Sequence, residues 1–213
     1  MTGTYFELFL LLANPGATDV TATVRYLLPD GNVTSRVHQV PAGTRRTVWV
    51  DHDEPQLADT ALAMSVGATA PIVAERAMWW PGVRETWTGG HSSVGTTYTA
   101  PKWGVSGLQA GGPSSAEPWI LVANPSTTVT TVRMTLLFAD GRPSIVADYP
   151  VGAQSRFTID VAGWHAETAD ASFGAVIEQL GDPTGIIVES AVYRDSGGVV
   201  WAAGRGGTAV PIP

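Results

Sequence analysis

The most constraining feature of the chain is a sequence repeat. The motif Leu-Ala-Asn-Pro at 12–15 returns as Val-Ala-Asn-Pro at 122–125, an offset of 110 residues. The dipeptide at 30–31, Asp-Gly, returns at 140–141 with the same offset. A repeat about one small domain long predicts two modules that share one fold and one order of elements.

The offset grows toward the end of each copy, where Ile-Val-Ala-Glu at 72–75 returns as Ile-Ile-Val-Glu at 186–189, 114 residues later. Insertions of this kind fall in loops between strands. We therefore expect the 213 residues to form two modules, 1–101 and 102–213. The segment around Trp103 has no counterpart before residue 5. The first module is therefore expected to lack an edge strand or to borrow one.

Polar and apolar residues alternate along most of both copies, which is the period of a strand with one buried face. The Asp-Gly pairs favour tight hairpin turns, and Asn14 and Asn124, each before a proline, are expected to cap turns with their side chains. Helix-period runs are nearly absent. The pattern predicts an all-β chain of two tandem antiparallel, Ig-like β-sandwiches. The expected strands are 6–13, 21–28, 32–40, 46–51, 61–66 and 71–80, then 119–123, 130–138, 144–149, 156–161, 172–178 and 185–194, with loops at 51–58 and 160–169.

Composition excludes several classes of function. The chain has no cysteine, so disulfides and zinc–thiolate sites are impossible. A net charge of −7 argues against a nucleic-acid partner, which needs clustered basic residues. The longest apolar run, 6–13, is too short to span a bilayer, so no membrane insertion is expected. No motif indicates a cofactor.

The chain also resembles a known kind of module. An aromatic-led strand ends in Leu-Leu-Ala-Asn-Pro at 11–15, an Asp-Gly turn follows, and Pro-Ile-Val-Ala-Glu-Arg-Ala-Met-Trp-Trp occupies 71–80. This order is similar to a tandem module of secreted and surface proteins of bacteria such as actinobacteria, chloroflexi and acidobacteria, a domain of unknown function. The resemblance implies a β-sandwich and an extracellular or cell-surface location, and no activity. The second copy departs from it with Glu-Ser-Ala-Val-Tyr at 189–193.

One loop offers metal ligands. Asp51, His52, Asp53 and Glu54 are consecutive and supply the oxygen and imidazole groups that divalent ions bind. The corresponding loop of the second copy keeps only Asp160 in register, and neither loop has the spaced acidic pattern of a calcium loop. The alternative is a solvated loop without an ion.

Two glutamates interrupt apolar strands. Glu75 and Glu189 recur in register, and a buried carboxyl group with a shifted pKa can act as a general acid. The alternative is structural, because buried charges need partners. We favour ion pairs of Glu75 with Arg46 and of Glu189 with Arg156.

Tryptophans are the remaining candidates for binding. Trp79 and Trp80 are consecutive, so in a strand they face opposite sides. Trp87, Trp164 and Trp201 lie near glycine-rich or polar segments. An exposed indole can stack on a sugar or anchor a protein contact, and the alternative is that these rings fill the cores.

No catalytic constellation stands out. The run Gly-His-Ser-Ser at 90–93 has no nucleophile-elbow motif and no counterpart in the second copy. The sequence therefore predicts a protein that is not an enzyme, acting as a structural, adhesive or assembly unit whose partners are other protein chains or further copies of itself at sheet edges. The alternative is a carbohydrate-binding module of a larger secreted protein, with glycans as ligands.

Overall fold

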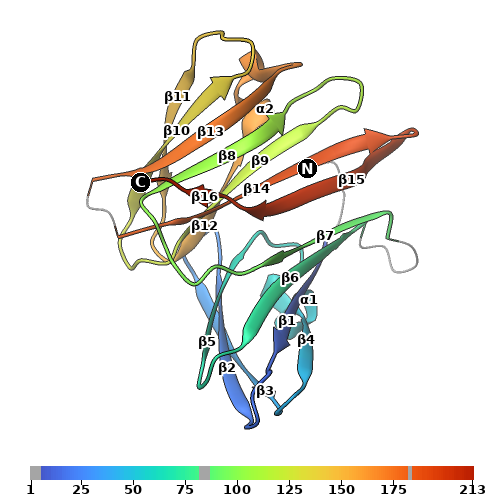
Figure 1. Ribbon diagram of the computed structural model, residues 1–213, viewed down its shortest axis with the longest axis vertical. Coiled ribbons are helices and arrows are strands. Elements are labelled where there is room, and N and C mark those ends of the chain that lie inside the picture. The colour runs from blue at the N-terminus through green and yellow to red at the C-terminus, as the bar shows by residue number, and fades with distance from the viewer. Residues whose placement is uncertain (1–5, 82–86, 182–183) are drawn as a thin grey trace.

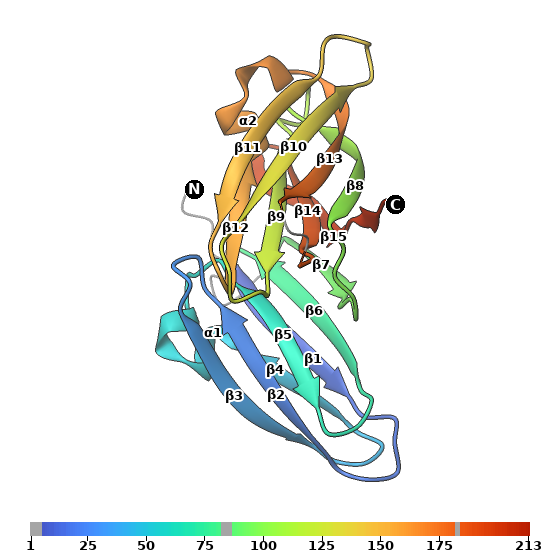
Figure 2. The ribbon, with the colours of Figure 1, turned by 90° about the vertical axis from the view of Figure 1, so that its left-hand side faces the viewer.

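The computed structural model describes residues 6–81, 87–181 and 184–213, and this part of the chain is all-β. Its strands form four antiparallel sheets, which pack in pairs as two β-sandwiches stacked along the long axis (Figures 1 and 2). Strands β1–β7 build the first sandwich and β8–β16 build the second.

The first sandwich has a four-stranded and a three-stranded sheet. We call them the β1 sheet, with order β4-β1-β6-β7, and the β2 sheet, with order β3-β2-β5. Alternate residues of each strand point into the shared core, which holds Leu10, Leu12, Val24 and Tyr26. The strands are β1 (Glu7–Ala13), β2 (Val20–Leu27), β3 (Val33–Val40), β4 (Arg45–Trp49), β5 (Ala63–Ala68), β6 (Val73–Trp80) and β7 (Gly89–Val94).

The second sandwich repeats this plan with two additional strands. Its sheets are the β9 sheet, with order β12-β9-β14-β15, and the β10 sheet, with order β11-β10-β13-β8-β16. Trp103 of β8 is fully buried, and its indole donates to the carbonyl oxygens of Ala100 and Ile186, both at 3.0 Å. The strands are β8 (Lys102–Gln109), β9 (Glu117–Asn124), β10 (Thr130–Phe138), β11 (Ile145–Val151), β12 (Ser155–Asp160), β13 (Ser172–Leu180), β14 (Ile187–Ser196), β15 (Val199–Thr208) and β16 (Val210–Pro211).

Strand pairing gives a residue-by-residue correspondence between the two sandwiches. In the first, Leu10 faces Val48 and Arg76, and in the second Ile120 faces Ile159 and Ser190. The same register places Arg45 opposite Ala13 and Arg156 opposite Ala123. The counterpart of Arg156 is therefore Arg45, and not Arg46, the arginine expected to pair with Glu75.

Two segments expected to be loops contain short helical turns. They are α1 (Val50–Asp53) with the 3-10 turn η1 (Pro55–Leu57), and α2 (Val161–Trp164) with η2 (Ala166–Thr168). Turns of three or four residues are too short to show a helical period in sequence. Each pair of turns buries apolar side chains and so closes one end of the core. These side chains are Val50 and Leu57 in the first sandwich and Val161 in the second.

The predicted turns form through the side chains that the sequence singled out. The Asn14 amide donates to the carbonyl oxygens of Thr18 and Val40, both at 2.9 Å, and Asn124 repeats this with Thr128 and Gly152. Gly31 and Gly141 have φ values of 84° and 78°, which glycine adopts without strain.

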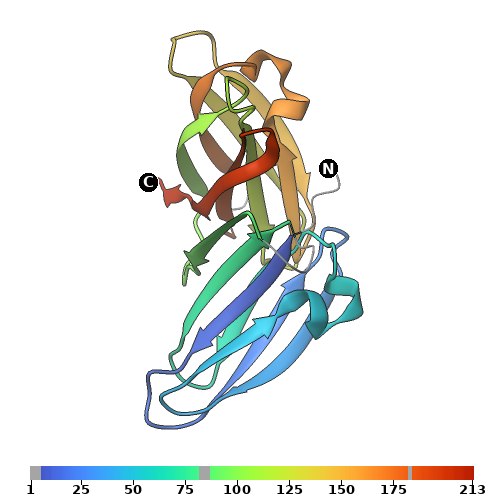
Figure 3. The ribbon, with the colours of Figure 1, turned by 90° about the vertical axis from the view of Figure 1, so that its right-hand side faces the viewer.

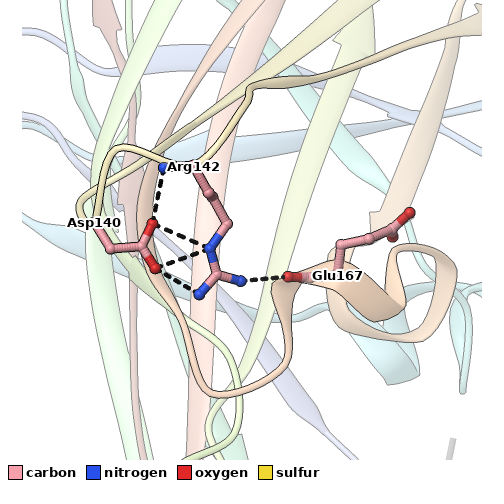
Figure 4. Close-up of polar contacts among 3 residues, drawn as sticks. All are labelled: Asp140, Arg142 and Glu167. Carbon is pink, nitrogen blue, oxygen red and sulfur yellow. Dashed lines mark hydrogen bonds and ion pairs between the residues drawn. The ribbon is translucent and has the colours of Figure 1, made fainter.

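The second Asp-Gly hairpin is also tied to a neighbouring loop. The guanidinium of Arg142 binds the Asp140 carboxylate and donates to the carbonyl oxygen of Glu167 in η2 at 2.9 Å (Figure 4). The hairpin between β10 and β11 is thereby held against the α2–η2 segment. Both side chains are exposed, so this contact fixes a loop and adds little stability.

Candidate functional site

The junction between the sandwiches is a third apolar core. The outer face of the β9 sheet packs against the end of the first sandwich where β6 and β7 project (Figure 3). Phe6, Met78 and Trp80 come from the first sandwich. The second sandwich contributes Trp119, Leu121, Ala191, Tyr193 and Trp201.

Trp80 is the central residue of this junction. Its side chain is fully buried, lies 5.2 Å from the Tyr193 ring centroid and donates its indole N–H to the carbonyl oxygen of Trp201 at 2.5 Å. Burying a tryptophan removes about 150–250 Å² from water, an upper limit of about 4–6 kcal/mol. The sequence predicted Trp80 and Trp201 as candidate ligand-binding residues, and that role does not fit side chains with 0% and 2% exposure.

Glycines make room for this contact. A Cβ atom built on Gly204 of β15 would lie 2.8 Å from the rings of both Trp80 and Tyr193. One built on Gly206 would lie 2.7 Å from the imidazole of His91. A side chain at either position would therefore push the two sandwiches apart, whereas a Cβ on Gly207 would meet nothing within 4 Å.

An ion pair crosses the junction beside the aromatic core. Nη1 of Arg76 in β6 lies 2.9 Å from Oε2 of Glu189 in β14, and both side chains are largely buried. Arg156 is close enough for its charge to interact with both. The pKa of Arg156 is lowered to about 10, chiefly by burial and also by the positive charge of Arg76, and Glu189 opposes the shift. Glu189 therefore pairs with Arg76 across the junction, and the expected Glu189–Arg156 pair contributes only at longer range.

The expected pair of Glu75 with Arg46 does not form. Glu75 faces Leu11 and Arg46 faces Leu12, so the two side chains leave the β1 sheet on opposite sides. Glu75 is exposed on the outer face. A polar residue between apolar neighbours is the normal pattern of a strand with one solvated face. Glu75 follows this pattern, so its carboxylate faces solvent and is not buried.

The four candidate metal ligands point to different partners. Asp51 is buried and accepts the Leu8 backbone N–H at 2.8 Å, while the His52 ring packs at a tilt against Trp49, with 4.0 Å between ring centroids. Asp53 accepts the Tyr26 hydroxyl at 2.7 Å. Glu54 forms an ion pair with Arg36. Within the described residues, no group of three or more His, Asp or Glu side chains is arranged to hold a metal ion. The contacts of Asp51 and Asp53 hold α1 against β1 and β2.

An aromatic cluster covers the outer face of the β1 sheet. Trp79 and Trp87 stack with centroids 5.2 Å apart, and Phe9 lies 6.2 Å from Trp87 and 5.5 Å from Trp49. Trp49, Trp79 and Trp87 are 41%, 39% and 48% exposed. Sequence reasoning missed Trp49 and Phe9. Their strand register, which places Phe9 opposite Trp49, is the signal that would have found them.

The fifth predicted tryptophan lies apart from this face. Trp164 of α2 is 50% exposed and packs beside Tyr149 and Phe157 of the second sandwich. The Tyr149 hydroxyl lies 2.6 Å from Nε2 of His165, which holds α2 in place. This cluster stabilises a loop and presents one isolated indole.

Two shallow hollows stand out on the described surface, and no convergent set of reactive groups lies near them. One, of about 340 Å³, is lined by Ser106, Gln109, Phe173 and Arg194 among others. The other, of about 480 Å³, is lined mainly by threonines of β10 and its preceding turn. His91 of β7 is turned into the junction while Ser92 is exposed on the opposite face, so the pair cannot act as base and nucleophile. None of the helices in the described residues is long and apolar enough to cross a membrane.

Comparisons with known proteins assign this chain to no family. No family model matches the chain, and no curated protein matches it. Among solved structures, Thermotoga maritima protein 1070 is similar with a TM-score of 0.47 and 9% identity, over 55% of this chain and 97% of that one. The Anabaena sensory rhodopsin transducer is similar with a TM-score of 0.36 and 14% identity, over 45% of this chain and 91% of that one.

Proposed function

We propose that this chain is a non-catalytic structural unit of the bacterial cell exterior, in which two sandwiches form one rigid rod that spaces or assembles surface proteins. The observation that carries the proposal is the buried junction around Trp80. Flexible domains meet through small polar interfaces, whereas this junction has an apolar core of its own.

Further support comes from the chemistry of the described residues. The strongly perturbed groups are His91, Arg156, Tyr193 and Tyr26, which are buried in the junction or between a strand and α1. They do not converge on a cleft, where catalytic groups with shifted pKa values normally gather. Their positions fit a role in holding the sandwiches and their end loops in place.

The test is whether the two sandwiches tumble as one body. NMR relaxation of the full chain is expected to give one rotational correlation time for both sandwiches. Gly204→Val places a side chain against Trp80 and Tyr193. This variant is expected to give a different rotational correlation time for each sandwich. Gly207→Val on the same strand is the matched control and is expected to behave as wild type. Independent tumbling of the wild-type sandwiches would overturn the proposal.

A second candidate function, glycan binding, is favoured by the exposed indoles of Trp49, Trp79 and Trp87. Aromatic faces stack on the apolar side of sugar rings. Against it, Trp79 and Trp87 stack on each other and so each covers part of the other's ring face. A glycan screen with Trp79→Ala beside Trp164→Ala tests this alternative.

A further inference from the structure

Each position on the outer face of the β1 sheet has a corresponding position on the outer face of the β9 sheet. By strand register, Trp79 of β6 corresponds to Tyr193 of β14, and Phe9 of β1 corresponds to Trp119 of β9. Trp87, just before β7, corresponds to Trp201, because the same offset of 114 residues relates Trp87 to Trp201 and Trp79 to Tyr193. The ring pairs also share their geometry. The ring centroids of Trp79 and Trp87 are 5.2 Å apart, and those of Tyr193 and Trp201 are 4.9 Å apart. In both pairs the angle between the ring planes is 26°.

The acidic residues beside these tryptophans also correspond in position. Trp87 donates its indole N–H to Glu7, a buried carboxylate, at 2.9 Å. Glu117, the counterpart of Glu7, lies near enough to Trp201 for that side chain to oppose the rise that burial gives its pKa, but the Trp201 indole nitrogen has no hydrogen-bond partner among the described residues. The same aromatic and acidic arrangement is therefore built twice, once on each sheet.

Among the residues that the structure describes, only the second of these two faces is covered. Tyr193 and Trp201 are 6% and 2% exposed because the first sandwich packs on them, whereas Trp79 and Trp87 are 39% and 48% exposed. The exposed face continues into Val73 and Val94, which are 45% and 60% exposed.

In the described residues, the outer faces of the other two sheets carry single exposed apolar side chains but no aromatic cluster. The β2 sheet presents Thr21, Thr23 and Arg25 with Val37, and the β10 sheet presents Thr131, Arg133 and Thr135 with Leu137 and Val146. Residues of this kind are normal for a solvated sheet face. An apolar sheet face rimmed by charge is typical of a protein contact.

The charges on the exposed face favour a second copy as its cover. On the buried face, Glu189 receives its cation from the covering sandwich, through Arg76. The counterparts of Glu189 and Arg156 on the exposed face are Glu75 and Arg45, both solvent-exposed. A two-fold pair of these faces would supply the Glu75 of each copy with the Arg45 of the other, and two-fold dimers are the commonest symmetric assembly.

We propose that the outer face of the β1 sheet packs against the same face of a second copy of this chain. The proposal rests on the assembly role proposed above and names its partner. The contact places Trp79, Trp87 and Trp49 of each copy at the centre of a symmetric interface, with Arg45 and Glu75 pairing at its rim. It differs from the edge-to-edge assembly expected from the sequence because side chains, and not backbone groups, make the contact.

The experiment is sedimentation of the full chain over a concentration series up to the millimolar range. Wild type is expected to dimerise reversibly. Threonine is a good strand former, so Trp79→Thr should keep the fold of β6. This variant is expected to raise the dissociation constant of the dimer roughly tenfold or more, as loss of a central aromatic anchor does. Trp164→Thr removes a more exposed indole, on the second sandwich, and is expected to leave the dimer unchanged.

Charge variants give a second, independent measurement. Glu75→Arg is expected to weaken the dimer by placing like charges together, and the double variant Arg45→Glu with Glu75→Arg is expected to restore it. A monomeric wild type at every concentration would overturn the proposal, and so would a dimer that Trp79→Thr and Glu75→Arg leave unchanged. A monomer whose Trp79 binds a glycan would assign the face to sugars. These outcomes leave the rigid-rod proposal standing, because tumbling of the two sandwiches is measured separately.

Discussion

The two sandwiches share one strand order but complete their cores in different ways. In the second, β8 and β16 extend the β10 sheet beyond β13, whereas in the first β5 is the outermost described strand of its sheet. Ile186 and Val188 are therefore fully buried, while their counterparts Ile72 and Ala74 are partly exposed. The first sandwich compensates at its other end, where the β9 sheet of its neighbour covers Trp80 and Met78. A repeated unit can thus use the adjacent unit as part of its core.

The largest expected effect comes from truncating the matched isoleucines. Ile186→Ala leaves a cavity in a closed core and is expected to cost about 2–5 kcal/mol of unfolding free energy. Ile72→Ala is expected to cost about half as much, because water already reaches part of the side chain and fewer contacts are lost. Urea denaturation of both variants makes the comparison. Equal losses would mean that the two cores are closed to the same degree.

The ion pair across the junction is expected to have the next largest effect. A double-mutant cycle of Arg76→Met and Glu189→Gln should give a coupling of about 1–2 kcal/mol, above the range of exposed pairs because both groups are largely desolvated. Lys102 and Glu178, 3.8 Å apart, more exposed and within the second sandwich, form the control pair. Their coupling is expected to stay below about 1 kcal/mol. A coupling at the junction no larger than the control's would show that the pair does not join the sandwiches.

A smaller effect is expected from pH, through His91. Burial in the junction, together with the charge of Arg76, lowers the pKa of His91 to about 4, below the ordinary value of 6.5. Between these values the unfolded chain binds a proton that the folded chain does not. The unfolding free energy should therefore fall as pH drops from about 6.5, and the fall due to His91 should end near pH 4.

Comparison with a variant isolates this contribution. His91→Asn cannot titrate, so its stability should decline less steeply over the same pH interval. The pKa of His38 is also lowered by burial, and both proteins share that background. Parallel pH profiles for wild type and His91→Asn would show that His91 titrates alike in the folded and unfolded chains.

Much of the fold follows from the sequence because its determinants are local. Period-two alternation, the Asp-Gly turns and the capping role of Asn14 and Asn124 all act over a few residues, and the structure contains each of them. Strands β7 and β15 escaped prediction because glycine disfavours strands in isolation. Their glycines are needed for close approach to Trp79, Trp80 and His91, a requirement that only the folded chain reveals.

The candidate site was harder to predict because it depends on which sheet faces meet. Alternation places Trp79 and Trp80 on opposite sides of β6, and it cannot tell which side another sandwich will cover. The Glu75–Arg46 pair failed for a related reason, since a shift of one residue in the register of β4 moves an arginine to the other face of the sheet. The repeat is informative because the covered face of one sheet identifies the matching face of the other.

The hydrogen bond from Trp80 to Trp201 joins residues 121 positions apart. At about 5–20 residues per second, a ribosome needs about 6–24 s to supply Trp201 after Trp80 has been added. The first sandwich therefore leaves the ribosome with one end of its core open to water, and translation speed sets how long that end stays open. Synthesis of β15 completes the first sandwich as well as the second.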